Sequence, residues 1–162
     1  MSLKLLSSHT IIYHLILFFS FSLSVNYFVE LKIVNFIAYV FFHLTLVYIA
    51  FYFFNFVLFF IYFLYGVMFD IFLINNISPH LITFLLFITI FYFMKKYLFN
   101  FSSYKISYIL IIILLMMFIV ETLIASIFFN YPINFENLRI IFLITIIIFF
   151  PTLLLFSKID KL

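Results

Sequence analysis

Apolar residues run along this chain in long stretches that short polar or charged segments interrupt. The first stretch covers residues 11–29 and is followed by the charged residue Glu30. A second run, residues 33–74, is 42 residues long and contains one carboxylate, Asp70. As a single helix it would extend about 63 Å, twice the hydrocarbon core of a bilayer, which is about 30 Å. The run must therefore fold back on itself, and Asn55 is its best turn signal.

The rest of the chain is divided by two polar turns and one lysine-flanked connection. Residues 75–79 (NNISP) form the clearest turn, and residues 130–134 (NYPIN) form another. Lys95, Lys96 and Lys105 flank the connection between them. The pattern predicts an all-α integral membrane protein, a bundle of about six transmembrane helices in a single polytopic domain covering residues 1–162. The expected spans are residues 11–29, 33–53, 56–74, 80–97, 106–129 and 138–156.

Composition supports the membrane class and excludes several others. The chain is 70% apolar and 8% charged, with a mean hydropathy of +1.44, whereas soluble domains are about 25% charged. It has no cysteine, which excludes disulfides and cysteine-ligated zinc. A single glycine cannot build a glycine-rich phosphate loop. The net charge of +3 is small and spread out, which argues against a nucleic-acid partner.

The distribution of basic residues predicts the orientation, because cytoplasmic loops are enriched in lysine and arginine. With six spans, only Lys32 and Arg139 face outward, and both termini are cytoplasmic. The inner side then carries Lys4, Lys95, Lys96, Lys105, Lys158 and Lys161. Five spans with an external N-terminus give the same charge ratio, so the length of the second apolar run is the argument for six. The first span lacks an Ala-x-Ala exit and is expected to be retained rather than cleaved.

Two carboxylates, Asp70 and Glu121, lie inside the expected spans, where such groups are expensive and usually face the bundle interior. Counted from the cytoplasmic ends of their helices, both lie about 21–22 Å up the bilayer core. Arg139, at the outer end of the last span, is the nearest expected cation. Asp70, Glu121 and Arg139 are therefore predicted to form an intramembrane polar cluster. Two interpretations stay open: a site for a proton, ligand or partner, and a structural contact between helices.

Other residues carry weaker expectations. Thr122, Ala125 and Ser126 are small residues on one helix, and we expect them to be a packing face. Pro151 should kink or break the last span. The four histidines, including His80, show no metal-ligand spacing. No catalytic constellation is recognisable in the sequence, so neither an enzyme, a metal nor a cofactor is expected.

The segment YGVMFDIF, with Gly66 and Asp70, followed by NNISPHL, resembles the signature of the rod shape-determining protein MreD family. That family has Gly-x-x-x-Asp at the end of its third span, then a short polar turn that usually contains Pro-Leu-Gly. Here the turn contains Pro79, and His80 stands where the family favours glycine. The six-span layout and a last span with Pro151 before a basic tail are also similar.

The resemblance implies a non-enzymatic component of the bacterial cell-wall elongation machinery in the inner (cytoplasmic) membrane. Such proteins maintain rod shape and bind MreC, and work through that complex with MreB, RodA and a penicillin-binding transpeptidase. Their fold is similar to the substrate-binding subunits of energy-coupling-factor transporters. That similarity suggests the alternative, a small-molecule-binding subunit of a membrane transporter. A membrane-embedded enzyme has only the two carboxylates in its favour.

Overall fold

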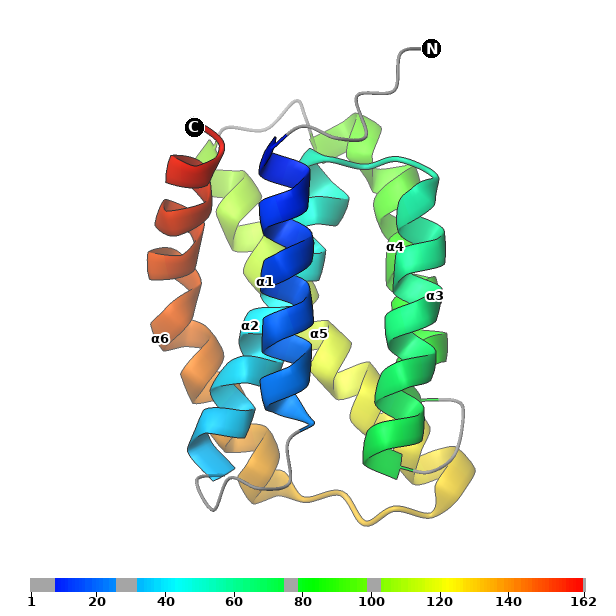
Figure 1. Cartoon of the computed structure of the whole chain (residues 1–162). Helices are drawn as coiled ribbons and strands as arrows, with labels where there is room; N and C mark the ends of the chain where they lie inside the picture. The colour runs from blue at the N-terminus through cyan, green and yellow to red at the C-terminus, as the bar shows by residue number, and fades with distance from the viewer. Residues whose placement is uncertain (1–7, 26–31, 75–78, 99–102, 162) are drawn as a thin grey trace. The chain divides into compact units, whose positions relative to one another are not determined.

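The computed structural model describes residues 8–25, 32–74, 79–98 and 103–161, and its secondary structure there is entirely helical (Figure 1). The all-α prediction is thus confirmed. The elements are α1 (Ser8–Ser24), α2 (Lys32–Tyr52), α3 (Val57–Phe69), a π-helical turn η2 (Asp70–Ile74), α4 (Pro79–Leu98), α5 (Ser103–Phe129) and α6 (Phe135–Ile159).

The helices follow the apolar stretches of the sequence, and the long second run is broken near its middle. α2 ends at Tyr52 and α3 begins at Val57. Between them, the Oδ1 atom of Asn55 accepts a hydrogen bond of 3.1 Å from the backbone N–H of Leu58. Asparagine often satisfies the first N–H groups of a helix in this way. Lys4, residues 26–29 of the first expected span and residues 75–78 of the polar turn lie outside the described residues.

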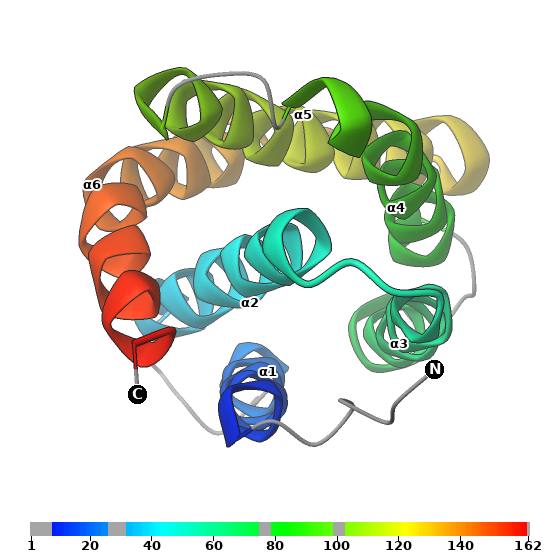
Figure 2. The ribbon, with the colours of Figure 1, turned by 90° about the horizontal axis from the view of Figure 1, so that it is seen from above.

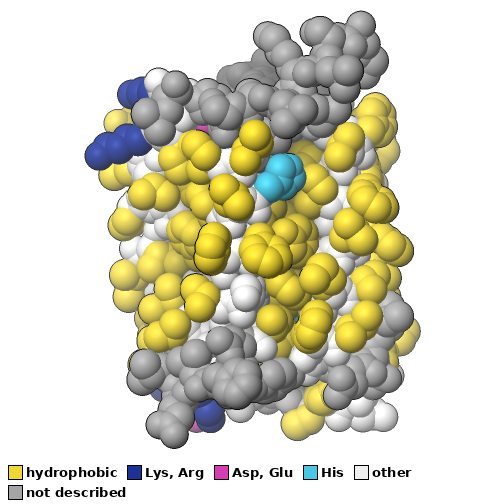
Figure 3. All heavy atoms as spheres, in the orientation of Figure 1, with side chains coloured by type: hydrophobic (Ala, Val, Ile, Leu, Met, Phe, Trp, Pro, Cys, Tyr) yellow, Lys and Arg dark blue, Asp and Glu magenta, His cyan; other side chains and the backbone are white. Residues whose placement is uncertain are grey.

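Three of the described helical segments are long and apolar enough to cross a bilayer: Lys32–Tyr52, Tyr104–Phe129 and Phe135–Ile159. The apolar segments Ile11–Ser24, Val57–Leu73 and Pro79–Met94 are shorter. In Figure 3, hydrophobic side chains cover most of the face in view, and the visible Lys and Arg side chains lie near its two ends. This distribution is typical of a surface that contacts lipid rather than water.

The chain divides into two compact units, which are described separately. Unit 1 comprises Met1–Leu46 and Ile140–Leu162, and unit 2 comprises Val47–Arg139. Unit 1 therefore contains α1, most of α2 and most of α6. Unit 2 contains α3, η2, α4 and α5.

Large aromatic side chains connect the helices of unit 1. The ring of Tyr13 in α1 packs edge-on against Phe156 in α6, with centroids 5.4 Å apart. The rings of Phe21 and Phe42 connect α1 to α2 across 6.2 Å. The hydroxyl of Tyr13 also donates a hydrogen bond of 2.6 Å to Oδ1 of Asp160, just beyond α6. α1 runs opposite to both α2 and α6 (Figure 1), so the start of α1 and the end of α6 lie at the same end of the unit.

In unit 2, α3 and α4 lie side by side and antiparallel, and α5 packs against α4 in the opposite direction (Figures 1 and 2). The face that α5 buries has helical periodicity, with spacings of three and four residues. Its buried side chains are Leu110, Ile113, Leu114, Met117, Phe118 and Glu121. Glu121 therefore continues an apolar stripe and does not interrupt it.

Candidate functional site: a buried aspartate at the start of α4

Asp70 lies where α3 changes into the π-helical turn η2, and its side chain is completely buried. π-Helical turns inside α-helices occur frequently at functional sites. At this junction the backbone N–H of Asp70 donates to the carbonyl oxygens of both Gly66 and Val67. The turn thus begins at the residue that bears the carboxylate.

The carboxylate of Asp70 accepts three hydrogen bonds from the start of α4. Its Oδ1 atom is 2.9 Å from the backbone nitrogen of His80 and 2.9 Å from Nδ1 of the His80 ring. Its Oδ2 atom is 3.1 Å from the backbone nitrogen of Leu81. The His80 ring donates to Asp70 in the tautomer that carries its proton on Nδ1. We call Asp70, His80 and Leu81 the Asp70 site.

The position of the carboxylate has a clear physical reason. The first backbone N–H groups of a helix have no acceptor within that helix, and leaving them unsatisfied in an apolar interior is costly. α4 begins with Pro79, which has no N–H to satisfy. The N–H groups of the next two residues, His80 and Leu81, donate to Asp70 at the start of η2. Asp70 therefore caps α4 from a neighbouring helix, at the end of the helix dipole that favours negative charge.

Aromatic rings enclose the Asp70 site. The ring of Phe69 stacks on the His80 imidazole, with centroids 5.3 Å apart and planes 23° apart. Phe84 meets both rings edge-on, and Tyr62, about two turns before Phe69 on α3, packs edge-on against Phe84. Phe69, Phe84 and Tyr62 are completely buried, and His80 is 6% exposed. The hydrogen bonds of Asp70 are thus formed in a dry environment, where they are strengthened.

Gly66 brings the two helices together one turn before Asp70. A Cβ atom added at Gly66 would lie 2.7 Å from Cα of Leu81, closer than real contacts allow. The backbones of α3 and α4 are therefore in contact at this point, and only glycine permits the approach. The two ends of the Gly66-x-x-x-Asp70 motif thus act on the same helix pair. Gly66 allows the backbones of α3 and α4 to touch, and Asp70 accepts hydrogen bonds from the first N–H groups of α4.

Of the predicted polar cluster, the structure places Asp70 and Glu121 in the buried interior and Arg139 at an exposed position near the start of α6. The described hydrogen bonds of Asp70 go to His80 and Leu81. A cluster that joins Asp70 to Glu121 and Arg139 stays a prediction. His80 is the partner that sequence reasoning missed, although it follows directly after Pro79 in the motif.

The remaining predicted residues lie on α5 and α6. Thr122, Ala125 and Ser126 are half-buried, and the Thr122 hydroxyl donates to the carbonyl of Phe118 in its own helix, at 2.7 Å. Their role as a packing face stays a prediction. α6 continues through Pro151 to Ile159, so the helix is not broken there.

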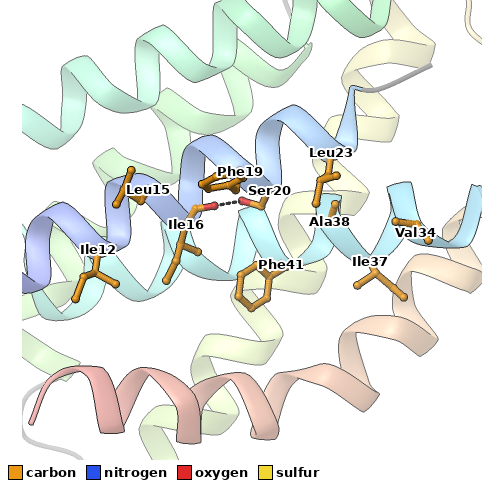
Figure 4. A pocket seen from close by; sticks show the side chains of 10 residues that line it. All are labelled: Ile12, Leu15, Ile16, Phe19, Ser20, Leu23, Val34, Ile37, Ala38 and Phe41. Atoms are coloured by element: carbon orange, nitrogen blue, oxygen red, sulfur yellow. Dashed lines mark hydrogen bonds between the residues drawn. The ribbon is translucent and has the colours of Figure 1, made fainter. Parts of the chain in front are cut away.

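An apolar groove of about 370 Å³ lies between α1 and α2 in unit 1 (Figure 4). Its lining includes Ile16 and Phe19 from α1, and Ile37 and Phe41 from α2. Ser20 is the one polar residue in the lining, and its hydroxyl donates to the carbonyl of Ile16 at 2.7 Å. Pro151 lines a second apolar groove, of about 340 Å³, between α2 and α6. Neither lining resembles a site that recognises a polar small molecule, which needs several convergent polar groups.

Comparison of the chain with protein-family models, with curated proteins and with solved structures finds no significant match. Among the residues that the structure describes, no three His, Asp or Glu side chains gather in a way that could hold a metal ion. The Asp70 site and the arrangement of the helices within each unit are therefore the features that bear on function.

Proposed function

We propose that all six helices cross the bacterial inner membrane and that both termini are cytoplasmic. The Tyr13–Asp160 hydrogen bond supports an even number of crossings, because it holds the start of α1 and the end of α6 at the same end of unit 1. A five-span chain would have its ends on opposite sides. Within each unit, successive helices alternate in direction (Figure 1), as six consecutive crossings require.

The proposed role is that of a non-enzymatic component of the cell-wall elongation machinery, which maintains rod shape. The chain would bind an MreC-like protein and act with MreB, RodA and a penicillin-binding transpeptidase through that complex. The Asp70 site is the observation that carries this proposal. The residues that carry the resemblance to the MreD family, Gly66, Asp70 and Pro79, belong to one structural unit. His80, where the family favours glycine, supplies a third hydrogen bond in that unit.

The proposed contact with the MreC-like partner is on the outer end of unit 2, near the segment that joins α5 to α6. Large apolar side chains are exposed there: Phe128 is 65% exposed and Phe135 is 74% exposed. Between them, Asn130 has a positive φ of 54°, which ends α5 sharply. A photo-crosslinker at Phe135 should capture the partner in native membranes. A crosslinker at Tyr104, which is 83% exposed at the other end of α5, is the matched control.

Depletion of the protein in rod-shaped cells tests the role directly. Cells should become round, and uptake of vitamins should remain normal. An Asp70→Leu variant should fail to restore the rod shape, whereas Phe69→Leu should restore it. Normal rods with impaired uptake of one small molecule would overturn the proposal in favour of the transporter subunit.

Reporter fusions test the topology separately from the role. Fusions after Lys4 and after Leu162 should both report the cytoplasm. Reporters on opposite sides of the membrane would contradict the six-span arrangement. That result would not affect the conclusion drawn from the cell-shape experiment.

A further inference from the structure

The two ends of unit 2 differ in charge. Residues 71–120 contain Lys95, Lys96 and Lys105 and no aspartate or glutamate. Residues 121–139, by contrast, contain Glu121, Glu136 and a single basic residue, Arg139. Lys95 and Lys96 belong to the last turn of α4 and Lys105 to the first turn of α5, and α4 ends where α5 begins, at the same end of the unit (Figure 1). We call this the lysine end.

Exposed aromatic side chains lie near the lysine end. Tyr97 is 69% exposed near the end of α4, and Tyr104 and Tyr108 are 83% and 63% exposed in the first turns of α5. Tyr92, further back on α4, contacts Phe56 with ring centroids 6.1 Å apart, so the turn between α2 and α3 lies at this end as well. Phe56 is itself 73% exposed. Tyrosine is enriched at the level of lipid headgroups, because its ring is apolar and its hydroxyl is polar.

We propose that the lysine end binds the headgroups of anionic phospholipids. Lys95, Lys96 and Lys105 supply the charge, and Tyr97, Tyr104 and Tyr108 lie at the level of the headgroups. Clusters of basic residues directly beside a membrane span attract anionic lipids electrostatically, and each lysine near the surface contributes to the attraction. The inference rests on the membrane placement proposed above and is independent of the role in cell-wall synthesis.

The absence of tryptophan from the chain makes a direct test possible, because one introduced tryptophan is then the only such emitter. A Tyr104→Trp variant places the reporter beside Lys105. A Phe128→Trp variant places it at the other end of α5, at a similarly exposed aromatic position, and is the matched control. Each purified full-length variant is reconstituted in vesicles of equal parts phosphatidylglycerol and phosphatidylcholine. One or the other lipid carries brominated acyl chains, which quench tryptophan.

Brominated phosphatidylglycerol should quench the Tyr104→Trp reporter about twofold more than brominated phosphatidylcholine does. The Phe128→Trp reporter should show no preference. Both lipids are present in both leaflets, so the orientation of the protein in the vesicle does not affect the result. Equal quenching of Tyr104→Trp by the two lipids would overturn the inference. Quenching by neither lipid would overturn the membrane placement, and the inference with it.

Charge variants separate lipid binding from a general effect of the reporter position. Replacing Lys95, Lys96 and Lys105 together with glutamine should abolish the preference, and replacing them with arginine should retain it. A preference that persists in the glutamine variant contradicts the proposal. If the triple glutamine variant does not fold, Lys105→Gln alone should reduce the preference, and an unchanged preference there contradicts the proposal equally.

Salt provides a test without substitution. Screening shortens from about 10 Å at 0.1 M salt to about 3 Å at 1 M, so the preference should decrease with added sodium chloride. Inorganic phosphate at matched ionic strength should reduce it no further. A selective effect of phosphate would indicate a site for free anions and would overturn the assignment to lipid headgroups.

Discussion

The α3–α4 pair and the α1–α2 pair are both antiparallel and both apolar, but they are held together differently. In α3–α4, Gly66 allows backbone contact and Asp70 forms three hydrogen bonds to the start of α4. In α1–α2, rings such as Phe21 and Phe42 connect the helices, and an apolar groove of about 370 Å³ lies between them. Hydrogen bonds and backbone contact fix one relative position, whereas apolar packing in a membrane has no hydrophobic driving force. The α3–α4 pair should therefore be the more rigid and the more sensitive to substitution.

The largest effect is expected for Asp70→Leu. The substitution leaves the backbone N–H groups of His80 and Leu81 without their acceptor in a buried position, which should lower the free energy of unfolding by about 3 kcal/mol. Unfolding of the purified protein in detergent, titrated with sodium dodecyl sulfate, measures this change. Phe69→Leu, at the neighbouring buried position, should cost about 1 kcal/mol. Equal destabilisation by the two variants contradicts the role assigned to Asp70.

Gly66→Ala should have the next largest effect, and its sign is informative. In a helix without a close neighbour, alanine is more stable than glycine by up to about 1 kcal/mol. Here the new methyl group would meet the backbone of Leu81. We expect a net destabilisation of about 1–2 kcal/mol in the same unfolding experiment. Stabilisation by alanine would show that α3 and α4 can move apart at this point without lowering the free energy of unfolding.

Tyr13→Phe probes unit 1 and should have a smaller effect. It removes the hydrogen bond to Asp160 and a longer one, of 3.3 Å, to the carbonyl oxygen of Phe156. Hydrogen bonds between membrane helices contribute about 0.6 kcal/mol on average. The ring contact with Phe156 is retained. Tyr104→Phe, at an exposed position, is the control and should leave the unfolding curve unchanged. A loss as large as that of Asp70→Leu would remove the distinction between the two helix pairs.

The smallest effect is expected for Ser20→Ala, which changes a buried polar residue in the lining of the α1–α2 groove. The Ser20 hydroxyl donates to the carbonyl oxygens of Ile16 and Leu17 in its own helix, and these hydrogen bonds do not join α1 to α2. Such bonds add little to the stability of a helix. The free energy of unfolding should change by less than about 0.5 kcal/mol. A large loss would mean that polar contacts hold the α1–α2 pair as well.

The all-helical class and the position of the break at Asn55 follow from the sequence, because a bilayer limits the length of an apolar helix. The hydrogen-bond partner of Asp70, in contrast, could not be predicted from the sequence. His80 is ten residues away, across a turn, and no helical periodicity connects the two positions. Charge alone pointed instead to Glu121 and Arg139.

The role of Gly66 in bringing two helices together was not predicted from the sequence, which named this residue only as part of the family motif. Thr122, Ala125 and Ser126 were predicted as a packing face of α5, and that stays a prediction. The structure shows backbone contact at Gly66, where the side chain is absent altogether. The grooves beside α2 depend on how neighbouring helices rotate about their axes, which the pattern of apolar residues does not determine.

The sequence separations of two contacts bear on the order in which the chain folds. Asp70 accepts hydrogen bonds from residues ten and eleven positions later in the chain. The loop that these contacts close is short, so the conformational entropy lost in closing it is small. The α3–α4 hairpin can therefore form during synthesis, soon after α4 emerges from the ribosome. Tyr13 and Asp160 are 147 positions apart. Unit 1 must consequently wait, with α1 already made, until residue 160 has been translated.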